Sequence, residues 1–444
     1  MKNKKDHKKR NLYFYIICLK MSTKNDTEGE TDAEKIKRLE AQVVQYKNII
    51  TKLTGQEKVK PGKSHKKGRV FEHELYCKRH VALHICYFGW NYHGFAVQET
   101  TGKTIESELF NALLLTKLIQ SRETSNYHRC GRTDKGVSAF QQVITIDLRS
   151  NLLEGPGVYS YEGCRAHERK RGDEDNEINY CKILNANLPP YVQVLAWAPC
   201  KELDYSARFD CSARTYKYFF PRGDLDLDLL KEAGGHLIGE HDYRNFCKMD
   251  VGNGVVNYHR RIMEVSVERI DATDSPYDMC ALVIKGKAFL WHQIRCIVAI
   301  LFRVASKKES PEIVKQLLDI EENPRRPQYL MASEIPLNLS YCEYKPELSW
   351  HHDSEAIMVT LKQLQDLWTE SSVKATMLRS ALNAIEDKAS SLISSTTSMQ
   401  VDNLYGMSKI KAGNYVQLLD MDKCLSLEEK LNAMPDRKKR KVIE

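Results

Sequence analysis

Residues 288–304 form an almost entirely apolar stretch of helical periodicity, and their only charged side chains are Arg295 and Arg303. A stretch of this kind has to be buried in a hydrophobic core. Arg295 lies in its middle, and an unpaired guanidinium in that position would be strongly unfavourable. The fold must therefore bring a carboxylate to Arg295, unless this side chain snorkels to the surface or bonds to helix carbonyls.

Asp134 is the carboxylate that we expect to pair with Arg295. It lies in a short turn at residues 132–137, between two predicted strands. An arginine that binds both carboxylate oxygens keeps the acid ionised and fixes its orientation, which is what nucleophilic catalysis requires. The same residue types also build ordinary turns, in which Asp bonds to nearby amides and Gly adopts a positive φ.

The composition favours a polyanionic partner. The net charge of +8, from 67 Lys and Arg against 59 Asp and Glu, suits nucleic acid better than an acidic small molecule. The apolar run at residues 12–19 is shorter than the roughly 20 residues that span a bilayer, so no membrane segment is predicted.

No metal or disulfide site is predicted. The 13 cysteines contain no C-x-x-C pair, and their odd number argues against a disulfide framework. His128 and His292 have no ligand-spaced companions. Cys130 and Cys296 lie in the two segments discussed above, and we expect both thiols to pack in the core.

The spacing of apolar residues predicts an α+β fold, with one continuous sheet or two joined sheets. Strands are expected near residues 80–87, 144–148, 213–220, 260–270 and 279–286, and helices after the N-cap Thr104 and over residues 288–304. Composition then divides the chain into a disordered extension at 1–31, a coiled coil at 32–55, a basic linker at 56–77, a first α/β subdomain at 78–200 that contains Asp134, a second α/β subdomain at 201–345, a helical extension at 346–385 and a mostly flexible tail with a basic end at 386–444. Residues 151–176 are predicted to be an exposed insertion without regular structure.

The segment 32–55 carries a heptad seam of Ile36, Leu39, Val43, Tyr46, Ile50 and Leu53. It predicts either a homodimer through this helix or a helix that docks on its own globular core. Residues 437–441 resemble a nuclear import signal, although such a basic run can equally be a solvated tail or an RNA-binding arm. The predicted location is the nucleus, with the cytoplasm as a second compartment.

Six motifs, in order, resemble those of the TruA family of tRNA pseudouridine synthases. They are residues 87–98, 127–139, 184–190, 207–218, 237–243 and 289–295, and the resemblance covers roughly residues 80–345. The heptad segment and residues 331–337 resemble the eukaryotic branch that modifies positions 38 and 39 of the anticodon stem-loop. Ser206, where many relatives have His, and residues 414–424, which lack expected basic residues, depart from the family pattern. The resemblance implies a TruA-like fold, in which two α/β subdomains share a central mixed sheet with a catalytic cleft.

This resemblance implies the isomerisation of uridine to pseudouridine in a tRNA anticodon stem-loop, without a cofactor. Asp134 would act at C1′, at C2′ or at C6 of the ring, Arg295 would pair with it, and Tyr216 would lie against the uracil. RNA contacts are expected from Arg132, Arg208, Arg214 and His292. Core packing for Tyr216 and simple solvent exposure for the arginines are the alternatives.

Three other functions remain open from the sequence. The chain could be a sister synthase that acts on other tRNA positions or other RNAs, a non-catalytic RNA-binding protein on the same scaffold, or a coiled-coil adaptor. The presence of Asp134, Tyr216 and Arg295 together favours an enzyme, because RNA binding alone requires none of them.

Overall fold

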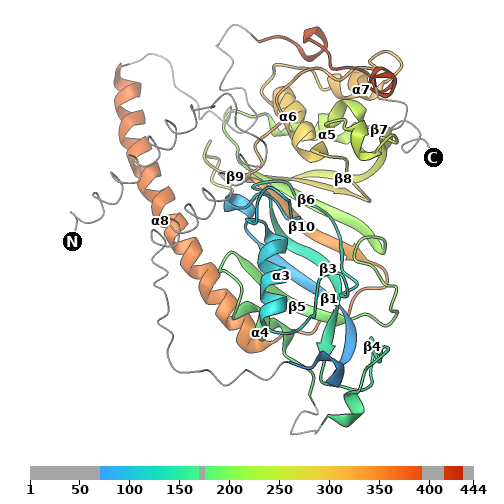
Figure 1. The fold of residues 1–444 in the computed structure, drawn as a ribbon. Helices are drawn as coiled ribbons and strands as arrows, with labels where there is room; N and C mark the ends of the chain where they lie inside the picture. The colour runs from blue at the N-terminus through green and yellow to red at the C-terminus, as the bar shows by residue number, and fades with distance from the viewer. Residues whose placement is uncertain (1–70, 170–175, 393–414, 434–444) are drawn as a thin grey trace, which may run out of the picture. The chain divides into compact units, whose positions relative to one another are not determined.

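The computed structural model describes residues 71–169, 176–392 and 415–433 (Figure 1). The predicted coiled coil at 32–55 and the basic run at 437–441 lie outside the described residues. Ordered structure begins earlier than the sequence suggested, because the last part of the predicted linker forms a 3-10 helix, η1 (His73–Leu75), and leads directly into the first strand.

One mixed sheet runs through the described residues, as an α+β class requires. Its strands are β1 (Cys77–Tyr87), β2 (His128–Arg129), β3 (Ser138–Ser150), β4 (Val158–Tyr159), β5 (Val192–Pro199), β6 (Cys211–Pro221), β7 (Gly239–Asp242), β8 (His259–Arg269), β9 (Met279–Gly286) and β10 (Leu337–Tyr344). The order is β4-β1-β3-β10-β6-β9-β8-β7, with β5 beside β1 and β2 beside β3. β10 lies parallel to β3, and the other paired strands in the described residues are antiparallel.

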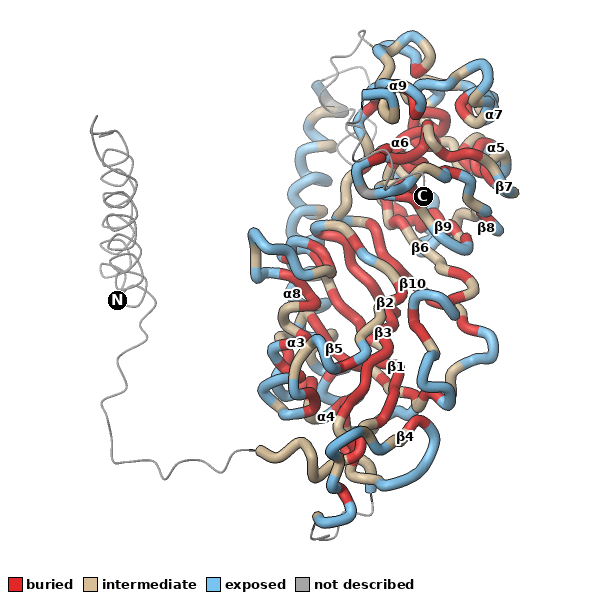
Figure 2. The backbone as a smooth tube through the Cα atoms, turned by 45° about the vertical axis from the view of Figure 1, so that its right-hand side comes forward, coloured by how far each residue is buried: buried red, intermediate tan, exposed pale blue. Residues whose placement is uncertain are grey.

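The first half of the sheet consists of β1, β3 and β5 with two helices, α3 (Ile105–Leu115) and α4 (Tyr180–Asn185). Thr104 caps α3 as predicted, since its hydroxyl accepts a hydrogen bond from the Ser107 amide at 3.2 Å. Figure 2 shows that the central strands are buried over most of their length, in agreement with their apolar side chains. The predicted insertion is less irregular than expected, because β4 pairs with β1 and a 3-10 helix, η3 (Ala166–Glu168), follows.

The second half packs β6, β8 and β9 against α5 (Leu227–Gly235), α6 (Gln293–Ala305) and α7 (Ile313–Leu318). The apolar helix is shorter than predicted, since α6 begins at Gln293. Residues 287–292 form a loop instead, and His292 has a φ of 60°, a left-handed conformation that cannot continue into a helix. Three further 3-10 helices lie in connections: η2 (Gly89–Asn91), η4 (Arg244–Phe246) and η5 (Val251–Asn253).

The C-terminal part is more ordered than the composition suggested. A single helix, α8 (Ser354–Leu392), continues beyond residue 385, where a loose tail was predicted, and contacts α4 and β5 (Figure 1). Residues 415–433 contain η7 (Leu418–Asp420) and α9 (Leu427–Asn432), whose leucines Leu418 and Leu427 are buried in the same core as α6. These residues form regular structure within the predicted tail, because Leu418 and Leu427 give the otherwise polar segment an apolar face. None of the helices in the described residues is both long enough and apolar enough to cross a membrane.

Candidate active site

A cavity of about 870 Å³ is lined by residues from both halves of the sheet. Asp134, Tyr216 and Arg295, the three residues predicted to be catalytic, all contribute to its wall. The other lining residues come mainly from three segments, 93–98, 132–137 and 289–295, each of which belongs to one of the sequence motifs. The fold thus brings together residues that are far apart in the chain.

The turn that carries Asp134 is held by close backbone contacts. Gly136 has a φ of 80° and donates its amide to the Tyr92 carbonyl at 3.2 Å. A Cβ atom on Gly136 would lie 2.7 Å from Cγ of Glu334, so this position also requires glycine for space. On the other side, the Phe95 amide donates to the Thr133 carbonyl at 3.1 Å. The carboxylate of Asp134 is therefore presented from a fixed backbone.

Asp134 is partly withdrawn from solvent, with 32% of its side chain exposed. Burial is the largest influence on its pKa and raises it above the ordinary value, whereas the nearby charge of Arg295 and a hydrogen bond from Trp291 oppose this rise. Glu334 adds to the rise through charge repulsion. A carboxylate with a perturbed pKa on the wall of a cavity is a typical candidate for a reactive group.

Arg295 does not form the direct ion pair with Asp134 that the sequence predicted. Its Nη2 atom instead donates to Oε2 of Glu334 at 2.7 Å, and its Nε atom donates to the Ala332 carbonyl at 2.7 Å. The physical argument for a buried partner was correct, but the structure supplies that partner from the segment preceding β10. Arg295 influences Asp134 through its electric field.

The side chain of His292 makes a direct contact with the carboxylate of Asp134. Its Nε2 atom lies 3.4 Å from Oδ2 of Asp134, and 11% of its side chain is exposed. Burial, aided by the charges of Arg295 and Lys248, lowers the pKa of His292 to about 4, so the imidazole is neutral at neutral pH. The contact is therefore a polar one and not a salt bridge. Because His292 also holds a left-handed backbone conformation, it is a strained residue at a candidate site.

Tyr216 faces the cavity from the middle of β6. Its ring meets Phe289 edge-on, at a centroid distance of 5.2 Å, and packs against both hydrophobic cores. Two residues further along the strand, Tyr218 is fully buried under α6. Tyr216 therefore stands where the core opens into the cavity, with an apolar ring on the cavity wall.

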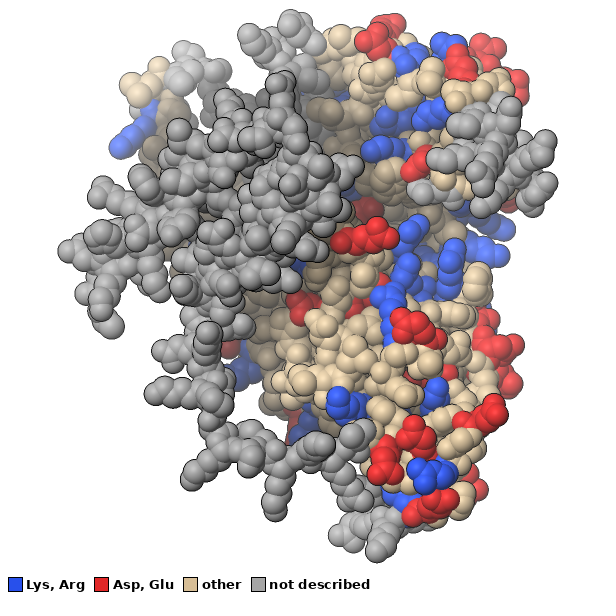
Figure 3. Space-filling view, viewed as in Figure 1, with Lys and Arg blue, Asp and Glu red and all other residues tan. Residues whose placement is uncertain are grey.

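Basic side chains surround the cavity. Arg132, Lys135, Arg208, Lys248, Arg260 and Arg295 line it, against the acids Asp134, Asp250 and Glu334. Figure 3 shows Lys and Arg side chains gathered across the middle of one face, between the two halves of the sheet. This excess of positive charge around an acidic centre suits a polyanion that carries a reactive group inward.

The predicted RNA-contact arginines differ in their surroundings. Arg132 and Arg208 are exposed at the cavity. Arg214 instead donates to the backbone carbonyls of Lys287, Cys130 and Arg208, at 2.6, 2.8 and 3.2 Å. Its donors are used inside the protein, which leaves the predicted phosphate contact of Arg214 without support.

The sequence analysis did not identify Glu334, Lys248 and Arg260 as site residues. Glu334 is the only acid in the short, mainly apolar segment 331–337, and such a single acid is a signal for an ion pair. Lys248 lies over the Trp291 ring, 4.7 Å from its centroid. Neither basic residue lies in one of the six motifs, so only the fold reveals their place at the cavity.

Comparisons with known proteins connect this site to one family. A family described as tRNA pseudouridine synthase matches residues 233–345. The chain is 40% identical over 429 residues to the tRNA pseudouridine(38/39) synthase of Homo sapiens, covering 91% of this chain and 85% of the human protein. It is 36% identical to the protein of the same name from Saccharomyces cerevisiae, over 86% of this chain and 84% of the yeast protein. Similarity to the tRNA pseudouridine synthase A of Methanosarcina mazei, at 30% identity, covers 62% of this chain and 89% of that protein.

The ion pair between Arg295 and Glu334 gives a stability prediction. We expect Arg295→Met to lower the free energy of unfolding by about 2–3 kcal/mol, because Glu334 then keeps a half-buried charge without its partner. Glu334→Gln should cost about 1–2 kcal/mol, and the double variant should show a coupling of about 1–2 kcal/mol in urea titrations.

The exposed pair Lys374 and Glu370 on α8 serves as the matched control. Its double-mutant cycle should give at most about 0.5 kcal/mol, since both groups remain solvated. Equal coupling in the two cycles would show that Arg295 gains nothing from its enclosed position.

Proposed function

The chain belongs to the tRNA pseudouridine synthase family, and we propose that it converts uridine to pseudouridine at positions 38 and 39 of the tRNA anticodon stem-loop. The choice of positions rests on the names of the mammalian and yeast relatives. The single observation that supports the chemistry is the arrangement of Asp134 and Tyr216 on one cavity wall beneath a basic rim.

The reaction breaks the N1–C1′ glycosidic bond, turns the base and joins C5 to C1′; C5 then loses its proton and N1 takes one up, so the composition is unchanged. Asp134 is the only carboxylate of the cavity that lies in the motif at residues 127–139. We assign it the role of nucleophile or base, at C1′, C2′ or C6. Its turn is fixed by glycine contacts, so the carboxylate is already oriented before RNA binds. The neutral His292, 3.4 Å from Asp134, limits the positions that this carboxylate can take.

The detached uracil has to remain in the cavity until it recombines. Tyr216 and Phe289 form an edge-on aromatic pair on the wall, and such rings offer a flat apolar surface against which a base can turn while water is kept away. A stacked uridine also has to be extruded from the anticodon arm, at a cost of a few kcal/mol. Arg132, exposed beside Asp134, is placed to hold a phosphate or to occupy the vacated space in the RNA.

Pseudouridine formation should depend on Asp134. The variant Asp134→Asn keeps the size of the side chain but cannot act as a nucleophile, so we expect pseudouridine formation to fall by at least about 10³-fold while tRNA binding stays within about threefold of the parent. Carbodiimide mapping of tRNA transcripts, with uridine at position 38, 39 or both, measures product at each site.

The outcome also tests the target positions. Product at other uridines, with positions 38 and 39 unmodified, would favour the sister-synthase function. Unchanged product in Asp134→Asn would refute the assignment of this residue. Asp250→Asn, a second cavity acid outside the motif, is the control and should retain turnover.

Pseudouridine formation should also depend on pH through the charge on Asp134. The raised pKa of Asp134 means that its ionised form, and the activity that depends on it, is present above this pKa and is lost as pH falls through it. Arg295→Gln removes the charge that lowers this pKa, so the acidic limb should move upward by about 0.5–1 pH unit. Glu334→Gln removes a charge that raises it, so the limb should move downward. The measurement is kcat/KM against pH for each variant. Shifts of both variants in the same direction would show that Arg295 and Glu334 do not act on the pKa of Asp134 with opposite signs.

The N-terminal segment carries a separate proposal. We propose that residues 32–55 form a coiled coil that joins two copies of the chain. Leu39→Asp places a charge in the seam and should convert a dimer to a monomer in analytical ultracentrifugation, whereas Ala41→Asp, on the opposite face of the heptad, should not. A parent chain that already sediments as a monomer would favour a helix docked on its own core.

A further inference from the structure

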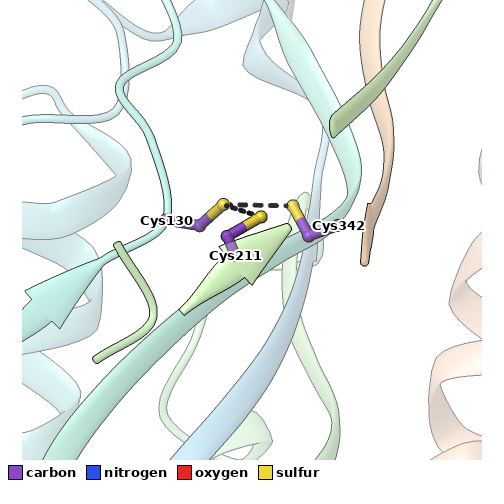
Figure 4. A group of neighbouring side chains, drawn as sticks. All are labelled: Cys130, Cys211 and Cys342. Carbon is purple, nitrogen blue, oxygen red and sulfur yellow. Dashed lines mark hydrogen bonds between the residues drawn. The ribbon is translucent and has the colours of Figure 1, made fainter. Parts of the chain in front are cut away.

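Three cysteines from distant parts of the chain meet in the core (Figure 4). The sulfur of Cys130 lies 3.5 Å from that of Cys211 and 3.4 Å from that of Cys342. All three sulfurs lie within 4.8 Å of one another. Their exposed fractions are 3%, 4% and 2%, so the group is shielded from solvent.

The positions of the three cysteines in the chain do not reveal this group, because the spacing between its members is far too long for a zinc-finger pattern. Cys130 follows β2, Cys211 begins β6 and Cys342 lies in β10, so only the sheet brings them together. Each of the three cysteines also lies near a cavity residue in the chain. Cys130 shortly precedes Asp134, Cys211 lies in the same strand as Tyr216, and Cys342 lies in the strand that follows Glu334.

The distances suit a tetrahedral thiolate site. Zn–S bonds of about 2.3 Å place neighbouring sulfurs about 3.8 Å apart. The two short S···S distances from Cys130 would have to lengthen by only a few tenths of an ångström. Thiolates select zinc and similar soft or borderline ions over magnesium or calcium, which prefer oxygen.

A nearby cation suits a negatively charged sulfur cluster, since the thiolate is the form of cysteine that binds a metal. Three thiolates and one divalent cation leave one negative charge. The Arg214 guanidinium, whose Nη2 atom donates to the Cys130 carbonyl at 2.8 Å, lies beside them and offsets this charge.

We propose that Cys130, Cys211 and Cys342 form a structural zinc site that clips together the three segments on which the active-site cavity is built. The metal takes no part in the isomerisation. It replaces weak contacts between thiols by strong metal–sulfur bonds between the Asp134 turn, the start of β6 and β10. Binding of the ion requires the release of the thiol protons and therefore weakens at low pH.

The test measures metal directly. The full chain is purified from zinc-supplemented cells, dialysed against metal-free buffer and examined by inductively coupled plasma mass spectrometry. We expect about one zinc per chain in the parent, as for a structural site, and at least a tenfold loss in Cys211→Ser and in Cys342→Ser. Cys181→Ser, which alters a fully buried thiol in α4 outside the group, is the control and should keep its zinc.

A second measurement on the parent decides the matter if the serine variants do not fold. Cobalt exchanged into the native chain should give thiolate-to-cobalt charge-transfer bands and the visible bands of a tetrahedral ion. A parent without bound zinc and without these bands would overturn the proposal, as would a disulfide among the three cysteines in non-reducing mass spectrometry. Because both readouts are independent of turnover, they stand apart from the outcome for the proposed reaction.

Discussion

The parallel pairing of β10 with β3 joins the two halves of the sheet, through Asn338 beside Ser138 and Leu339 beside Ala139. β3 follows directly on the turn that carries Asp134, and β10 follows directly on the segment that carries Glu334. On its other side β10 pairs with β6, where Leu339 lies opposite Tyr216. This one strand therefore fixes the turn, the aromatic wall and the acid that holds Arg295 relative to one another.

Asp134, Glu334 and Arg295 are neighbouring charges in the cavity, and the Arg295 guanidinium acts on the two carboxylates unequally. Glu334 takes the direct hydrogen bond from Arg295, and Asp134 receives only the more distant field. A direct, bidentate pair would have stabilised the ionised form of Asp134 more strongly and lowered its pKa further. The observed arrangement leaves Asp134 with a raised pKa, while the guanidinium still has a partner and does not carry an unpaired charge in the core.

The burial of the apolar helix and the turn at 132–137 predicted that Asp134 and Arg295 come together, whereas the place of Tyr216 beside them was implied only by the resemblance to the family. The sequence could not predict which acid binds Arg295, since that depends on the register of β10 and not on local pattern. The start of α6 could not be predicted from the sequence either. Residues 288–292 have helical periodicity, but His292 adopts a left-handed conformation, so the helix begins only at Gln293. The cysteine group illustrates the same limit, since spacing rules find ligands that are near in the chain and miss those that only a sheet assembles.

The distribution of charge around the cavity separates attraction from chemistry. On the proposed function, the basic side chains around the cavity, which include Arg132, Arg208 and Lys248, would draw in phosphates at long range, where the summed field of the protein matters. The centre carries the opposite sign through Asp134, and if this residue acts at C1′, breaking the glycosidic bond would build positive charge on the sugar beside it. A carboxylate at that point stabilises the developing charge only if it is ionised and fixed in place beforehand. The turn that contains Gly136 fixes the position of Asp134, and the charge of Arg295 offsets part of the cost of burying this carboxylate. The same arrangement of charges would therefore bind an anionic RNA and stabilise a cationic centre within it.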